Sequence, residues 1–328
     1  MAADILIIGL GETGASIGLA LARSGGDFRR TGYDPNLETA RAAQKSGAVD
    51  RLTSNPRLTA SQADLIIHSL NPAALGPGLE NLVEDMKPDA LLVDTTSLKQ
   101  SILSTIPARL KPGASFVGAV PILGAEKVFH VGAIEPSADL YAGGLLALVL
   151  PPGTPSSAVE VCTDLATLLG ATPFFLEAAE LDAAVAAAET LPVVVAAAYL
   201  RSLAASPGWR DQGQLAARAF NHLTRLAASR PAAEIAEDLA ANRSNIIRWI
   251  DSLLSELEAI RGIVARADAQ DLSRRFEEAL TTYETWQVQR RRGPAEFAAP
   301  MPEGSTGSAF ARLLGLRRPR KPGAEKTR

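Results

Sequence analysis

The sequence predicts a two-domain α/β protein, in which a doubly wound parallel sheet is followed by an all-helical dimerisation domain. In the first half, short apolar or β-branched runs alternate with helical patterns, which is typical of a parallel sheet. After about residue 176 the strand signals stop, and long helices rich in Ala and Leu follow. The length of 328 residues fits two domains of ordinary size.

The predicted strands are short runs bounded by turn residues. They are Asp4–Ile8, Arg30–Tyr33, Leu65–His68, Leu91–Asp94, Ser115–Gly118, Leu145–Leu150 and Pro173–Leu176. Helical patterns separate them, including Gly14–Ser24, Leu37–Ser46 and Ser156–Leu169. The order strand, glycine turn, helix, strand and acidic residue is how a doubly wound nucleotide-binding fold begins.

Four long helices are predicted in the second half, over Ala178–Ala205, Gln214–Ser229, Ala232–Ala267 and Gln270–Arg291. The third carries a broad apolar stripe at helical spacing, from Ile246 to Val264. Since no sheet is predicted to cover these helices, we expect a second copy of the chain to do so. The sequence therefore predicts a homodimer formed through the helical domain.

Composition excludes several classes of protein. Hydrophobic residues make up 47% and charged residues 21%, which excludes wholesale disorder. A single cysteine, Cys162, excludes a disulfide framework and a cysteine-based zinc site, and no metal centre is predicted. No signal peptide or uninterrupted apolar run of about 18 residues is recognised, so we expect a cytoplasmic protein without a membrane span.

The C-terminal residues differ in charge from the rest. Residues 290–328 contain ten Lys or Arg and three acidic residues, out of totals of 33 and 36, so the body before them is acidic. An acidic body does not predict a nucleic-acid partner. Residues 293–328 read as a flexible basic tail, which either is disordered and solubilising or ends in a short amphipathic anchor.

A glycine turn follows the first strand. Gly9, Gly11 and Gly14 form the pattern G-x-G-x-x-G, and Glu12 and Thr13 fill the last two variable positions. Gly9 makes the turn, Gly11 lets a pyrophosphate approach the backbone, and Gly14 allows close packing of helix on strand. The phosphates would bind at the free N–H groups of the following helix.

An acidic residue stands at the end of the second strand. Asp34, 20 positions after Gly14, would accept hydrogen bonds from the adenosine ribose and would repel a 2′-phosphate, which favours NAD over NADP. In the alternative interpretation, Asp34 only caps the helix that begins at Leu37. Ser69 follows the strand Leu65–His68, at the place that passes the nicotinamide ribose in Rossmann dehydrogenases, and His68 either contacts NAD or lies at the edge of the core.

An ordered set of motifs between Ile5 and about Ala279 resembles the prephenate/arogenate dehydrogenase family of tyrosine biosynthesis. The matching segments are ILIIGLGETGASIGLAL, GYDPN, VDTTSLK at 93–99, FVGAVPILGAEK at 116–127, ETLP, and LTRLAASRP at 223–231. The resemblance implies a Rossmann domain over 1–176 that binds NAD and a substrate and dimerisation domain over 177–292. It also implies the oxidative decarboxylation of a cyclohexadienyl alcohol.

The resemblance also implies roles for individual residues. Ser97 and Lys99 match the Ser and Lys of the family's D-x-x-S-x-K segment, where Ser97 either bonds the substrate or nicotinamide or caps the next helix. Arg225 matches the arginine that clamps the substrate's side-chain carboxylate, so an anionic small molecule is the expected substrate. Glu189, in ETLP, is predicted to border the substrate.

The chain departs from the family pattern at the histidines. Val120 stands where the family has the histidine that accepts the hydrogen bond of the reacting hydroxyl. Thr190 and Val193 replace the two histidines of S-H-L-P-H, and His222 replaces the aspartate of D-x-x-R. Three explanations remain open: the base has moved to His222, His130 or Glu189; the substrate is a different small molecule; or NAD is bound without turnover, as in a sensor.

Overall fold

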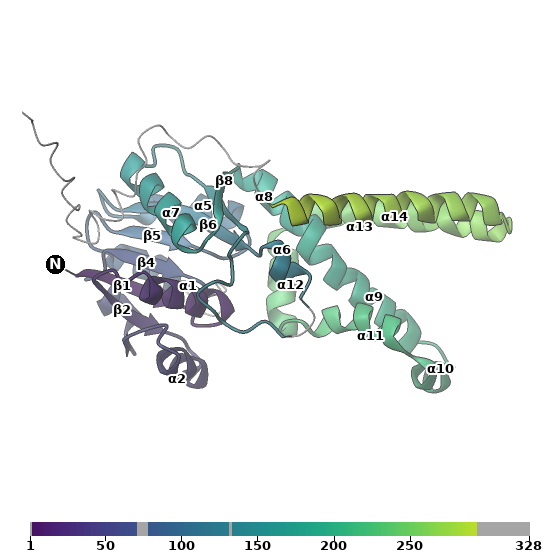
Figure 1. Ribbon diagram of the computed structural model, residues 1–328, viewed down its shortest axis with the longest axis horizontal. Coiled ribbons are helices and arrows are strands. Elements are labelled where there is room, and N and C mark those ends of the chain that lie inside the picture. The colour runs from purple at the N-terminus through teal and green to yellow at the C-terminus, as the bar shows by residue number, and fades with distance from the viewer. Residues whose placement is uncertain (1, 71–77, 131–132, 294–328) are drawn as a thin grey trace, which may run out of the picture. The chain divides into compact units, whose positions relative to one another are not determined.

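The computed structural model describes residues 2–70, 78–130 and 133–293 (Figure 1). Internal contacts divide the chain into two compact units. The first, called here the nucleotide unit, takes in the described residues within 1–96, 103–176 and 290–293. The second, the helical unit, takes in residues 97–102 and 177–289.

One eight-stranded sheet forms the centre of the nucleotide unit, in the order β3-β2-β1-β4-β5-β6-β7-β8. The strands are β1 (Ala3–Ile8), β2 (Phe28–Tyr33), β3 (Arg51–Leu52), β4 (Leu65–His68), β5 (Leu91–Asp94), β6 (Ser115–Ile122), β7 (Leu145–Val149) and β8 (Thr172–Phe175). All neighbouring pairs are parallel except β6 and β7, which are antiparallel. The predicted fold class is confirmed, and the order reverses between β1 and β4, where such sheets bind ligands.

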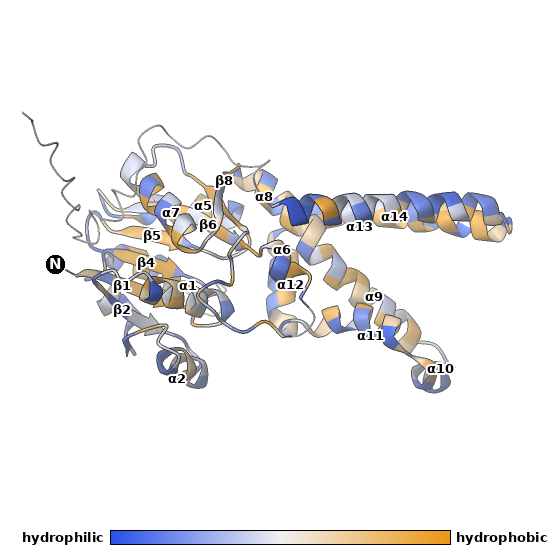
Figure 2. Cartoon of the chain, viewed as in Figure 1, coloured by the Kyte–Doolittle hydropathy of each residue, from blue (hydrophilic) through white to orange (hydrophobic). Residues whose placement is uncertain are grey.

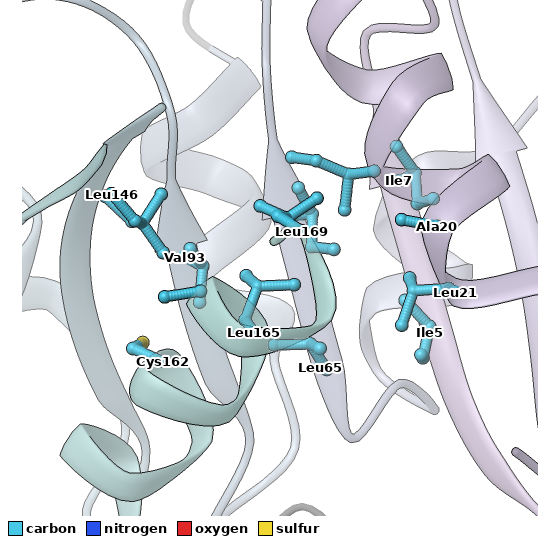
Figure 3. Close-up of a cluster of buried hydrophobic side chains, with 14 of the residues drawn as sticks. Ile5, Ile7, Ala20, Leu21, Leu65, Val93, Leu146, Cys162, Leu165 and Leu169 are labelled. Carbon is cyan, nitrogen blue, oxygen red and sulfur yellow. The ribbon is translucent and has the colours of Figure 1, made fainter. Parts of the chain in front are cut away.

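Helices cover the sheet on both faces. The helical elements between Glu12 and Leu168 are α1 (Glu12–Arg23), α2 (Leu37–Lys45), α3 (Pro56–Ala60), α4 (Gly78–Asp85), α5 (Gln100–Thr105), α6 (Ala125–Val128) and α7 (Ser156–Leu168), with a 3₁₀ turn, η2 (Pro107–Arg109). The first three residues of α5 belong to the helical unit. Figure 3 shows α1 and α7 packing apolar side chains, among them Leu21 and Leu165, onto Ile5, Leu65 and Val93 of the strands. Figure 2 shows the buried strands β4 and β5 as hydrophobic, which agrees with strands covered on both faces.

The helical unit contains no strand within its described residues. Its elements are α8 (Ala178–Val185), a π-helical turn η3 (Ala186–Thr190), α9 (Leu191–Ala204), α10 (Trp209–Leu215), α11 (Arg218–Thr224), η4 (Arg225–Ala228), α12 (Ala232–Ala241) and α13 (Arg243–Ala265), with most of α14 (Ala269–Arg292). The predicted tail lies outside the described residues apart from Gly293.

The prediction of one helix over Gln214–Ser229 is wrong. Ala216 and Ala217 adopt extended backbone between α10 and α11. The break allows Phe220 of α11 to lie 6.1 Å, between ring centroids, from Trp209 of α10. A continuous helix would separate these residues by about 16 Å along its axis. Aromatic packing therefore replaces helical continuity here.

The single helix predicted over Ala232–Ala267 is also divided, at Asn242. The Asn242 side chain is buried, and its Nδ2 donates to the backbone carbonyl of Asp182, 2.7 Å away on α8. A buried amide needs such a partner.

The two-residue strand β3 was not predicted, because two residues are too short for a periodic signal.

One helical stretch, Ala178–Ala204, is long and apolar enough to cross a membrane by length and composition. It includes the π-helical turn and Pro192. Its α9 part packs against α11, η4 and α13, and Ala196 is fully buried. The stretch is therefore a core helix of the helical unit.

Truncating Leu165 should test the core of the nucleotide unit. Leu165 is fully buried, so Leu165→Ala removes packed methyl groups and should lower the free energy of unfolding by about 2–5 kcal/mol. Leu58→Ala, at a side chain that is 60% exposed, should cost less than about 0.5 kcal/mol. Urea denaturation measures both, and equal effects would contradict the assigned core.

Candidate functional site

The glycine turn after β1 brings two backbone segments into contact. Gly9 has a φ of +88°, and its N–H donates to the Tyr33 carbonyl at 2.8 Å. A Cβ on Gly14 would lie 1.8 Å from the Gly9 carbonyl oxygen, and a Cβ on Gly9 would lie 2.7 Å from the Ser69 backbone. Side chains are excluded at both positions, so the start of α1 packs directly on the end of β1.

Gly11 differs from the other two glycines. It is the N-cap of α1, and a Cβ built on it would meet no atom of the described part of the chain within 4 Å. The protein itself does not require glycine there, but a phosphate approaching the N-terminus of α1 would. Glu12 occupies the first turn, and desolvation by its surroundings raises the pKa of its carboxyl.

Asp34 supports the turn from the end of β2. One carboxylate oxygen accepts from the Leu10 N–H at 2.8 Å and the other from the Asn36 N–H at 2.8 Å. Asn36, rather than Asp34, caps α2, since its Oδ1 accepts from Glu38 and Thr39. The alternative that Asp34 only caps this helix is therefore wrong. A carboxylate has further lone pairs with which to accept from a ribose.

Thr13 forms a contact that the sequence did not suggest. Its Oγ1 lies 2.9 Å from the Tyr141 phenol oxygen. Burial raises the pKa of Tyr141 to about 12, while the hydrogen bond with Thr13 acts in the opposite direction. The phenol is therefore neutral at physiological pH and ties α1 to the segment before β7.

The ends of β4 and β5 are joined by polar side chains. Ser69 donates its backbone N–H to Ile8 at 2.7 Å, and its hydroxyl lies 2.7 Å from the Thr95 hydroxyl. Next to them, His68 Nδ1 lies 2.7 Å from Asp94 Oδ1, and both side chains are fully buried. Ser69 is thus next to the glycine turn, while His68 belongs to the buried layer beneath it.

Ser97 and Lys99 lie in the segment 97–102, which belongs to the helical unit. Ser97 is exposed, whereas Lys99 is fully buried. The buried Asp182 carboxylate accepts from the backbone N–H groups of Lys99, at 2.7 Å, and Gln100, at 3.1 Å. Asp182 thus satisfies N–H groups at the start of α5, which a cap would otherwise do.

The remaining predicted residues of the helical unit lie on α9 and its neighbours. Glu189 is exposed and lies in the π-helical turn, a distortion often found at functional sites. Val193 is buried on α9. His222 on α11 and Arg225 at the start of η4 are exposed, and both elements pack against α9. The fold of this unit therefore gathers these segments around one helix.

Two further positions belong to the nucleotide unit. Val120 lies on β6, which extends to Ile122 rather than ending at Gly118, and its side chain is partly buried. His130 is exposed after α6. Val120 has no polar side-chain atom, and within the described residues no hydrogen bond holds the His130 ring in place for a proton transfer, so geometry does not single out His130.

Comparison with known proteins identifies the family. Residues 17–173 match the profile of the prephenate dehydrogenase nucleotide-binding domain, and residues 177–278 match that of the prephenate dehydrogenase dimerization domain. The chain belongs to the prephenate dehydrogenase family. It is an oxidoreductase of that family, so the family and enzyme class predicted from the sequence are confirmed. The first match starts after the glycine turn, whose interpretation rests on the geometry above.

Relatives cover most of the chain. It is 29% identical over 279 residues to the prephenate dehydrogenase of Bacillus subtilis (strain 168), covering 84% of this chain and 74% of the relative. It is 25% identical over 281 residues to the cyclohexadienyl dehydrogenase of Zymomonas mobilis, covering 84% and 93%.

Solved structures share the fold. The prephenate dehydrogenase of A. aeolicus, in complex with hydroxyphenyl propionate and NAD+, matches with a TM-score of 0.76 at 22% identity, covering 87% of this chain and 98% of that one. The Synechocystis arogenate dehydrogenase matches with a TM-score of 0.67 at 21% identity, covering 86% and 99%.

Sequence reasoning missed the contacts that depend on tertiary structure. Asp94 and Asp182 were not singled out, although each is a buried carboxylate. An acidic residue ending an apolar strand, as Asp94 does, was the available signal. The sequence around Tyr141 contains no such signal, because nothing near it in the sequence indicates a partner 128 positions away.

The Tyr141 phenol should ionise later than the other tyrosines. Its pKa of about 12, against an ordinary value of 10.0, means that its contribution to stability is present below pH 10 and is lost as the pH rises toward 12. Absorbance titration should show one of the four tyrosines ionising last, and Tyr141→Phe should remove that component. Loss of a component near pH 10 instead would contradict the burial of this phenol.

Proposed function

We propose that this chain catalyses the NAD+-dependent oxidative decarboxylation of prephenate or arogenate. The observation that carries the proposal is the glycine turn supported by Asp34, in a chain of the prephenate dehydrogenase family. Bound NAD+ would take a hydride from the ring carbon that bears the hydroxyl, as the ring carboxylate leaves as carbon dioxide and the ring becomes aromatic. We assign the cofactor to residues 1–176 and the substrate to residues 177–292.

Each of the proposed cofactor residues contacts a different part of the dinucleotide. Gly11 leaves room for the diphosphate at the N-terminus of α1, where unpaired N–H groups and the helix dipole favour an anion. Glu12 and Thr13 contribute their backbone N–H groups at the same end of α1. Asp34 accepts from the adenosine ribose and disfavours the 2′-phosphate of NADP. Ser69 lies where the nicotinamide ribose would pass.

The substrate residues come from the helical unit. Arg225 binds the side-chain carboxylate through its guanidinium, and Lys99 adds positive charge for the anionic substrate. Ser97 bonds the ring hydroxyl. His222 accepts its proton, in place of the family histidine that is Val120 here, and Glu189 borders the same substrate. Support for His222 is that α11 packs against α9, which carries Val193.

A second candidate function is NAD binding without turnover. The valines at positions 120 and 193 favour it, because neither side chain accepts a proton. In that case the protein would be a sensor or would act on another small substrate. Turnover with prephenate or arogenate distinguishes the two candidates.

We also propose that the protein is a cytoplasmic homodimer. Four apolar side chains of α13 and five of α14 are each at least 41% exposed: Ile247, Leu254, Leu257, Val264, Phe276, Leu280, Tyr283, Trp286 and Val288. Figure 2 shows apolar residues along both helices. Surfaces of this kind are usually covered by a partner, and the matched dimerization domain ends at residue 278, within α14.

Two substitutions should separate cofactor binding from substrate binding. Gly11→Ala should raise the KM for NAD+ by about tenfold or more, because the methyl group occupies the approach of the phosphate. Arg225→Gln should raise the KM for prephenate and leave that for NAD+ unchanged, whereas Arg218→Gln, exposed on α11, should alter neither. NADH absorbance measures all three. No NADH formation by the unmodified protein with either substrate would overturn the proposed reaction.

A charge on the apolar surface should separate the subunits. Leu257→Glu or Phe276→Glu should convert the dimer into monomers, since a charge would be buried at the interface. Leu58→Glu, on an exposed side chain of the nucleotide unit, is the matched control and should remain dimeric. Light scattering during gel filtration gives the mass, and a dimeric Leu257→Glu/Phe276→Glu double variant would exclude this interface.

A further inference from the structure

Beneath the exposed residues of the nucleotide unit lies a buried pair, His68 and Asp94. The two residues are register partners on the neighbouring parallel strands β4 and β5. Their side chains project from the sheet face opposite to the cluster that contains Ile67 and Val93. Nδ1 of His68 lies 2.7 Å from Oδ1 of Asp94, and neither side chain has any exposed surface.

The contact defines which nitrogen donates. A carboxylate can only accept, so Nδ1 carries a proton and donates it to Asp94. Nε2 of His68 is buried and has no hydrogen-bond partner among the described residues. An unpartnered buried nitrogen is costly, so packing alone gives no reason for histidine at this position. The hydrogen bond from Nδ1 to Asp94 does give a reason for histidine at this position.

From Asp94, further hydrogen bonds lead along the chain toward Ser97. Oδ2 of Asp94 accepts from the Thr96 hydroxyl at 2.8 Å. The His68 carbonyl accepts from both the backbone N–H of Thr95, at 2.8 Å, and its hydroxyl, at 3.0 Å. The residues immediately before Ser97 are therefore held from two sides, by the Asp94 carboxylate and by the His68 backbone.

We propose that His68 is a positioning residue of the dehydrogenase: its Nδ1–H orients the Asp94 carboxylate, which holds Thr96 and so fixes the segment that presents Ser97. The inference rests on the proposed function, because that function gives Ser97 its role. It concerns the hydrogen bond at Nδ1 and not a contact of Nε2 with any ligand. Without the donor, a buried carboxylate loses a charge-assisted hydrogen bond, and the Thr95–Ser97 segment loosens.

Replacing His68 by asparagine or by glutamine tests which ring nitrogen is needed to hold Asp94. In asparagine, Nδ2 stands two bonds from Cβ, as Nδ1 does in histidine, so His68→Asn keeps the donor to Asp94. In glutamine the amide is one bond further out, near the place of Nε2, so His68→Gln removes that donor. Both variants lose the ring, so each controls for the lost packing of the other.

The first readout is steady-state kinetics with prephenate and NAD+. His68→Gln should lower kcat by about 10- to 100-fold with little change in the KM for NAD+, because a small displacement of a catalytic group slows the chemical step. His68→Asn should stay within about threefold of the unmodified protein. Cys162→Ala, a fully buried site on α7, controls for lost stability and should not alter kcat.

The second readout does not need turnover. Hydrogen exchange of a peptide covering residues 94–99 should be faster in His68→Gln and unchanged in His68→Asn. In the unmodified protein, nitrogen NMR of the histidine side chains should show His68 protonated at Nδ1. These results would support the positioning role even if neither substrate were turned over, in which case only the proposed function would fail.

The remaining outcomes overturn the inference. Rescue by glutamine and not by asparagine would make Nε2 the important atom. Equal effects of the two variants, whether large or negligible, would mean that the Nδ1 donor has no special role. Protonation of His68 at Nε2 rather than Nδ1 in the NMR spectrum would remove the hydrogen bond on which the proposal depends, without requiring any variant to fold.

Discussion

The close approach of α1 to the end of β1 is the constraint on which the site depends. Gly14 packs against the Gly9 carbonyl at a distance that no Cβ would permit. It fixes the start of α1 at the end of β1, and beside Gly11 a Cβ would meet no atom of the described residues within 4 Å. Asp34 then fixes the turn through Leu10. A dinucleotide site follows from backbone geometry, and side chains mainly tune which cofactor it accepts.

Buried carboxylates with hydrogen-bond donors are a second feature of the structure, one at the end of β5 and one on α8. The carboxylates of Asp94 and Asp182 are both buried, and each accepts hydrogen bonds from groups next to Ser97 or Lys99. Burying a carboxylate is unfavourable unless such donors are present. The segment between β5 and α5 is therefore held by hydrogen bonds to two buried carboxylates, while the Ser97 side chain stays exposed.

The fold and the cofactor turn could be predicted from the sequence because their signals are local. The strand, the three glycines and Asp34 lie within 34 residues, and short apolar runs bounded by turn residues predicted every strand of the described residues except β3. Helix ends in the second half were less predictable, since the breaks near Ala216 and at Asn242 serve contacts with Trp209 and Asp182. The pairing of His68 with Asp94 requires the register of β4 on β5, which no local pattern specifies.

In the proposed NAD site, unpaired backbone N–H groups at the start of α1 and the Asp34 carboxylate bind the cofactor. Isothermal titration calorimetry of the purified protein with NAD+ and then NADP+ tests this binding most directly. We expect saturable binding of one NAD+ per chain and weaker binding of NADP+, because the Asp34 carboxylate would repel the 2′-phosphate. The absence of heat with both nucleotides, under conditions in which the protein is folded, would contradict it.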